Sequence, residues 1–237
     1  MDSYIGFYML DEETIISIEK KRMRLAFIPT IVFISFLWLI FLLDVSLDLK
    51  IYKLGVYPLR MNGLYGIFFS PLIHSSVKHL LSNTLPLIVL MWCLFFFYRE
   101  IAYKTFLFLW ILSGFLTWII GREAWHIGAS SIIYSLSFFL FFSGILRKHI
   151  PLIAISLIVA FLYGSTVWNM LPLSMYLDPG VSWEGHLSGG VSGLVVAIIY
   201  RKHGPQKPKK VWIDDEYDFE DEIEKLSEED EFPEEVL

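Results

Sequence analysis

Cysteine is almost absent from this chain of 237 residues, which has only Cys93, inside an apolar run. A single thiol excludes an intrachain disulfide and any metal site built from several cysteines. The zinc-binding motif HExxH is absent as well. We therefore expect a buried, unreactive thiol at Cys93, and neither a metal ion nor a cofactor.

Acidic residues are absent from two long stretches, 49–99 and 124–177. The whole composition is apolar, with 55% hydrophobic and 17% aromatic residues and a mean hydropathy of +0.56. A helix that crosses the hydrocarbon core of a bilayer needs about 20 apolar residues. Charges confined to short segments between long apolar runs exclude an ordinary soluble domain and indicate a multi-pass membrane protein.

The net charge of −6 is distributed unevenly along the chain. Residues 214–237 contain 14 acidic residues and one lysine, so the rest of the chain carries a net positive charge. This division is typical of a membrane domain with a soluble tail. We expect a cytoplasmic N-terminal segment (1–24), a membrane domain (25–202) and a mostly disordered cytoplasmic acidic tail (203–237). A short helix over 218–226 is the alternative for the tail.

Apolar segments predict an all-α membrane fold with six transmembrane helices, at about 25–43, 79–98, 104–120, 130–146, 150–167 and 185–200. Lysine and arginine near the ends of these spans number thirteen on one side and five on the other. The positive-inside rule then places both termini in the cytoplasm, as an even number of spans requires. Loop 44–78 falls on the other side, and its apolar content predicts partial embedding in the membrane.

Polar residues at membrane depth are candidates for function because they are costly there. His79 and Asn83, at the outer end of the second span, share one helix face through their i, i+4 spacing. Taken alone, such a pair is more often helix packing than catalysis. Two further histidines, His74 and His126, are expected to be hydrogen-bonding loop residues near the same site.

Two more clusters fall on the same side of the membrane. Gly128-Ala129-Ser130-Ser131 opens the fourth span, where small residues allow close backbone approach and could direct backbone N–H groups toward a substrate. Tyr134 follows one turn after Ser130. The sixth span opens with Glu184-Gly185-His186, followed by a GxxxG stripe at Gly189 and Gly193 that favours a close helix crossing.

Together the three clusters contain the parts of a hydrolytic site. A serine hydroxyl is a weak nucleophile until a base takes its proton, and a neutral histidine such as His186 suits that task. The oxyanion of a tetrahedral intermediate needs hydrogen-bond donors, which Asn83, His79 and the backbone of Ser130 could provide. Since the membrane spans offer no acidic third member, we expect a serine–histidine dyad.

The ordered motifs resemble the rhomboid family of intramembrane serine proteases over roughly residues 25–202. His79-x-x-x-Asn83 matches the family's HxxxN, Gly128-Ala129-Ser130 its GxS, and His186-x-x-Gly189-x-x-x-Gly193 its HxxGxxxG. The resemblance implies that Ser130 is the nucleophile, that His186 is the general base and that Tyr134 lies against it. Two positions depart from the pattern: Ser131 replaces the glycine of GxSG, and Tyr65-Gly66 occupies the region of a Trp-Arg pair in the first loop.

The resemblance also implies the reaction, which is hydrolysis of peptide bonds in or near the transmembrane segments of single-span membrane proteins. The site would open to the non-cytoplasmic side of a membrane, which we expect to be a bacterial plasma membrane. A nucleic-acid partner is not expected. The alternatives are a related pseudoprotease that binds membrane clients without cutting them and, with less support in the absence of an inverted repeat, a transporter.

Overall fold

A computed structural model describes residues 12–172 and 180–208 of the chain. These residues are helical and contain no strand; one isolated antiparallel bridge joins Val56 to His126. The chain divides into a compact unit of residues 1–207 and a second unit from residue 208 onward. The expected acidic tail lies outside the described residues beyond position 208, as does the alternative helix over 218–226.

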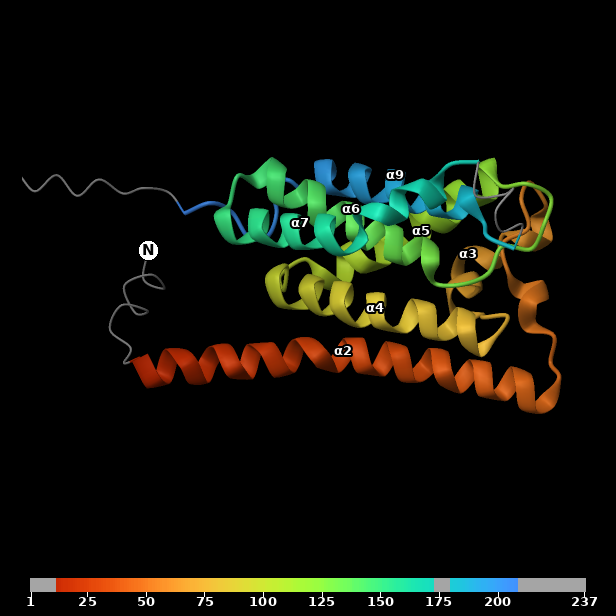
Figure 1. Cartoon of the computed structure of the whole chain (residues 1–237), viewed down its shortest axis with the longest axis horizontal. Coiled ribbons are helices and arrows are strands. Elements are labelled where there is room, and N and C mark those ends of the chain that lie inside the picture. Colours follow the sequence, from red (N-terminus) through yellow and green to blue (C-terminus); the bar gives the residue numbers. More distant parts are fainter. Residues whose placement is uncertain (1–11, 173–179, 209–237) are drawn as a thin grey trace, which may run out of the picture. The chain divides into compact units, whose positions relative to one another are not determined.

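All six apolar segments predicted from the sequence are helices, within a few residues at most ends (Figure 1). They are α2 (Glu12–Leu47), α4 (Val77–Phe97), α5 (Ala102–Ile120), α6 (Ser130–Arg147), α7 (Ile150–Tyr163) and α9 (Trp183–Ile199). Four of them, α2, α4, α5 and α6, combine the length and hydropathy needed to cross a membrane. Helix α7 has only 14 residues, so six crossings stay a prediction.

Helix α2 is longer than the predicted first span, because it begins at Glu12 and continues without a break for 36 residues. Glu12 and Glu13 favour this start, since acidic side chains in the first turn interact well with the helix dipole. Residues 12–24 are therefore helical and continuous with the predicted first span. Helix α2 packs along α4, where the Trp38 indole donates to the Thr84 hydroxyl at 3.3 Å.

Helix α6 lies at the centre of the bundle and is the most buried of the long apolar helices. It contacts α4, α5, α7 and, most extensively, α9. A Cβ atom at Gly189 would lie 2.3 Å from the Ser131 carbonyl oxygen, and one at Gly193 would lie 2.4 Å from that of Ser135. The two glycines thus permit the close helix crossing that the GxxxG stripe predicts.

The segment between α2 and α4 consists of short helical turns: η1 (Ile51–Leu54), η2 (Met61–Gly63), α3 (Gly66–Phe69) and η3 (Ser70–Leu72). It packs on α5, where the Trp110 indole donates to the Ile67 carbonyl at 3.0 Å. Phe68 and Phe69 are exposed on its surface. An apolar surface of this kind agrees with the expected partial embedding of loop 44–78, although its depth in a membrane stays a prediction.

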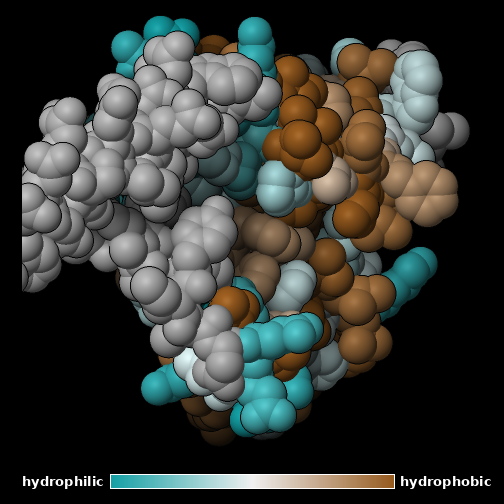
Figure 2. All heavy atoms as spheres, turned by 90° about the vertical axis from the view of Figure 1, so that its left-hand side faces the viewer, coloured by the Kyte–Doolittle hydropathy of each residue, from teal (hydrophilic) through white to brown (hydrophobic). Residues whose placement is uncertain are grey.

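The opposite end of the bundle, where α2 begins and α6 and α9 end, is shown in Figure 2. In this view hydrophilic residues lie mainly at the top and bottom, and hydrophobic side chains cover much of the right-hand side. Exposed basic residues close the helices at this end, among them Lys148, Arg201 and Lys202. Such a distribution is the one that the positive-inside rule expects of a cytoplasmic face.

Candidate active site

The structure brings together the three polar clusters singled out in the sequence, at the end of the bundle where α4, α6 and α9 begin. Ser130 is the first residue of α6, and His186 lies in the first turn of α9. His79 lies in the first turn of α4, whose N-cap Ser76 accepts the His79 backbone N–H at 3.1 Å. Side chains far apart in the sequence therefore converge on the start of α6.

Helix α9 presents His186 to α6 through a ring stack. The imidazole lies parallel to the Tyr134 ring, with centroids 4.3 Å apart and planes 16° apart. Tyr134 follows Ser130 by four residues, so both side chains lie on the same face of α6. Gly189 allows the two helices to pack this closely, because a Cβ atom at position 189 would lie only 2.9 Å from the Tyr134 Cβ. His186 thus faces the side of α6 that carries Ser130.

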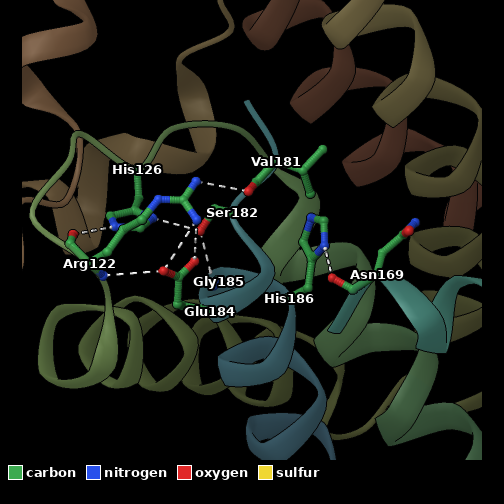
Figure 3. Close-up of polar contacts among 8 residues, drawn as sticks. All are labelled: Arg122, His126, Asn169, Val181, Ser182, Glu184, Gly185 and His186. Carbon is green, nitrogen blue, oxygen red and sulfur yellow. Dashed lines mark hydrogen bonds and ion pairs between the residues drawn. The ribbon is translucent and has the colours of Figure 1, made fainter. Parts of the chain in front are cut away.

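The His186 ring has a backbone partner that sequence reasoning did not find. Its Nδ1 lies 3.1 Å from the carbonyl oxygen of Asn169, in the 3₁₀ helix η4 (Gly164–Met170) that follows α7 (Figure 3). A carbonyl can only accept, so Nδ1 carries the proton and Nε2 of the neutral ring is left as the basic atom. Since every residue has a carbonyl, no side-chain motif could have indicated this contact.

The loop that leads to Ser130 requires glycine at position 128. Its φ angle is +107°, a conformation that other residues rarely adopt. A Cβ atom there would also lie 2.6 Å from Nε2 of His79 and 3.7 Å from Nδ2 of Asn83. The backbone approach that the small residues predict is therefore confirmed, and it brings both polar side chains of α4 against the loop, two residues before Ser130.

Two backbone N–H groups of this loop are engaged within the protein. The Gly128 N–H donates to the Ser70 carbonyl at 2.8 Å, and the Ala129 N–H donates to Nε2 of His74 at 3.4 Å. Burial, together with the nearby His79, lowers the pKa of His74 to about 3, which keeps its ring neutral and able to accept. The expectation that these two amides face a substrate was wrong. The Ser130 amide, at the first position of α6, has no acceptor within the helix.

Asn83 is buried, and its Nδ2 has no hydrogen-bond partner among the described residues. A buried donor without a partner is costly, and such groups in native structures call for an explanation. His79 accepts from, or donates to, the Ser75 hydroxyl through Nδ1 at 3.3 Å. With Ser75 donating, the ring proton is on Nε2, the atom that faces Gly128. Both side chains then offer a donor beside the start of α6.

His126 and His74 are hydrogen-bonded loop residues near this site, as expected from the sequence. Cys93 is buried, also as expected. Across residues 12–172 and 180–208, no three histidine, cysteine or acidic side chains come together as a metal ion would require. The arrangement instead combines a hydroxyl, a correctly protonated imidazole and several donors, which is the set that acyl transfer needs.

Several known proteins are similar to this chain over most of its length. The sequence model of the Rhomboid domain matches residues 61–203. Uncharacterized proteins of Mycobacterium bovis and Mycobacterium tuberculosis are each 36% identical over 174 residues, which cover 70% of this chain and 72% of theirs. An uncharacterized protein of Mycobacterium leprae is 31% identical over 187 residues, 76% of this chain and 73% of its own.

Proposed function

The chain belongs to the rhomboid family, and on that basis we propose that it is an intramembrane serine protease. Its substrates would be single-span membrane proteins, cut in or near the transmembrane segment. Ser130 is the proposed nucleophile and His186 the proposed general base. The observation that carries the proposal is the stack of His186 on Tyr134, with Nδ1 occupied by a carbonyl and Nε2 left as the base.

In the proposed reaction, Nε2 of His186 takes the proton of the Ser130 hydroxyl while Oγ attacks the carbonyl carbon of the scissile bond. The imidazolium then gives this proton to the leaving amine as the C–N bond breaks. A water molecule, deprotonated by the same Nε2, hydrolyses the acyl-enzyme ester and regenerates Ser130. The acceptor of Nδ1–H is a neutral carbonyl. It therefore assists His186 by fixing the orientation of the ring, and not by supplying a buried negative charge.

The tetrahedral intermediate carries a negative oxygen that needs donors fixed in advance. Three groups supply them in this proposal: the Ser130 amide, Nδ2 of Asn83 and Nε2–H of His79. The amide also lies at the N-terminus of α6, where the helix dipole favours negative charge. The absence of a partner for Asn83 Nδ2 among the described residues supports this assignment over a packing role.

A serine-directed fluorophosphonate tests the proposal against its rival, a pseudoprotease that binds clients without cutting. The purified full-length chain in proteoliposomes is expected to react with the probe and to cleave a reporter transmembrane substrate, and prior reaction with the probe should block cleavage. A chain that binds the reporter but neither reacts nor cuts would overturn the protease in favour of the pseudoprotease.

Both termini are proposed to be cytoplasmic, with the site open to the other side of the membrane.

The adjacent serines are expected to differ in role. Successive helical residues point about 100° apart, so Ser130 and Ser131 cannot both face His186. The Ser131 backbone lies against Gly189, at the crossing of α6 with α9. Position 131 is the one at which the family pattern has glycine. We expect Ser131→Gly to keep or raise the cleavage rate in proteoliposomes.

Thermal unfolding of the Ser131→Gly variant is the control, since added backbone freedom costs about 0.5–1 kcal/mol in a helix. Ser131→Ala serves as the matched variant, because it removes the hydroxyl without adding that freedom. Loss of probe labelling in Ser131→Ala, with labelling retained in Ser130→Ala, would make Ser131 the nucleophile.

A further inference from the structure

Glu184, two residues before His186, is almost completely buried, with 2% of its surface exposed. Its carboxylate faces Arg122, which directly follows Gly121, the C-cap of α5. The Arg122 guanidinium places Nη1 3.4 Å from both carboxylate oxygens and donates from Nη2 to the Val181 carbonyl at 3.0 Å (Figure 3). The Arg122 backbone N–H also lies 3.4 Å from Oε1. One arginine therefore contacts both the first turn of α9 and the residues just before it.

A second contact runs beside this ion pair. Nε2 of His126 lies 3.0 Å from the Arg122 carbonyl, so Nε2 carries the ring proton and Nδ1 accepts from the Ser182 hydroxyl at 2.6 Å. Ser182 is the N-cap of α9 and accepts the Gly185 N–H at 3.1 Å. Burial lowers the pKa of His126, which keeps the ring neutral and Nδ1 available as an acceptor.

These contacts fix loop 121–129, the segment that leads directly to Ser130 at the start of α6. His126 also exchanges two backbone hydrogen bonds with Val56, at 2.8 and 3.0 Å. The loop is therefore held on one side by the segment between α2 and α4, and on the other by the start of α9. Loss of Arg122 alone would leave the Glu184 carboxylate as an unpaired buried charge, which is strongly unfavourable.

We propose that Arg122, Glu184, His126 and Ser182 form a latch that positions Ser130 relative to His186. Glu184 precedes His186 by two residues, about 200° around the helix, so it faces the loop while His186 faces α6. Glu184 is thus a positioning residue that acts through the first turn of α9 and not on the substrate. The catalytic consequence rests on the proposed protease function.

The test compares Glu184→Gln, Arg122→Gln and the double variant with Glu123→Gln, in full-length protein in proteoliposomes. Glu123 is the matched control because it is exposed and lies in the same loop. Misalignment of nucleophile and base affects the transition state more than substrate binding. The number of active sites is determined by titration with the fluorophosphonate, and kcat is expressed per active site. We expect each latch variant to lower this kcat on the order of tenfold. KM should stay within about twofold of the wild-type value. The double variant should be no worse than either single variant, and Glu123→Gln should match wild type.

Hydrogen exchange of the amides in 122–129 provides a readout that does not depend on activity. Exchange should rise in Glu184→Gln and stay at the wild-type level in Glu123→Gln. If Glu184→Gln does not fold, Arg122→Lys is the second variant, since it keeps the charge but not the fork that reaches both Glu184 and Val181. A wild-type kcat per active site in the folded variants overturns the latch, whatever the exchange shows. If the wild-type protein neither reacts with the probe nor cleaves the reporter, the proposed protease function is overturned instead. In that case, unchanged hydrogen exchange in Glu184→Gln would overturn the latch as well.

Discussion

Replacing Ser130 by alanine is expected to lower cleavage of a reporter substrate by roughly 10⁴-fold or more, and His186→Ala is expected to do the same. Without the hydroxyl no acyl-enzyme can form, and without the imidazole nothing takes its proton. The two residues act as a unit, so the double variant should be no slower than either single variant. Cleavage in proteoliposomes, with fluorophosphonate labelling measured in parallel, gives the comparison.

Both replacements must leave the helices packed for this result to bear on chemistry. His186→Ala removes the partner of Tyr134, so its thermal unfolding should be measured beside that of Ser130→Ala, whose side chain is only partly buried. Substantial turnover in either folded single variant would refute the serine–histidine pair. Labelling that survives in Ser130→Ala would show that the probe reacts elsewhere.

Asn83→Ala is expected to lower kcat by roughly 10- to 1000-fold, a range whose upper part is the effect of losing one oxyanion donor in a serine protease. Substrate binding should change much less, because the donor acts on charge that develops only in the transition state. Fluorophosphonate labelling should be reduced but still detectable, since Ser130 and His186 remain. The measurement is steady-state cleavage of the reporter, which separates kcat from KM.

Ser82→Ala is the matched control for Asn83→Ala. Ser82 is the neighbouring residue on α4, is exposed, and donates its hydroxyl to the His79 carbonyl at 2.8 Å. Its loss should leave kcat near wild type. An unchanged rate in Asn83→Ala would assign Asn83 to helix packing. Equal losses in both variants would point to a general disturbance of α4.

The sequence predicts the helices well because few ways exist to satisfy a backbone in lipid. Apolar length therefore locates α4, α5, α6 and α9 within a few residues. It fails to predict the start of α2, because residues 12–24 are mostly polar and continue the helix without a membrane requirement. It also overextends α7, which ends at Tyr163 and changes there to the 3₁₀ helix η4.

The site could be predicted as far as its side chains carry the signal. The spacing from His79 to Asn83 and from His186 to Gly193 follows helical geometry, which the sequence displays directly. The latch illustrates what stays hidden. Glu184 and Arg122 are 62 positions apart, and a charge gives no indication of its partner until the fold is known. His126 was expected to hydrogen-bond near the site, but its partner Ser182 was not foreseen.

The bond from His186 to the Asn169 carbonyl has a consequence for genetic studies of this protein. In a Ser-His-Asp triad, exchanging the acidic residue removes the group that orients the histidine. Here the orienting atom belongs to the main chain, and the Asn169 side chain is exposed. Alanine scanning would therefore score position 169 as dispensable, because the contact does not depend on the side chain there. Only a change in the path of the backbone through η4 would remove the contact.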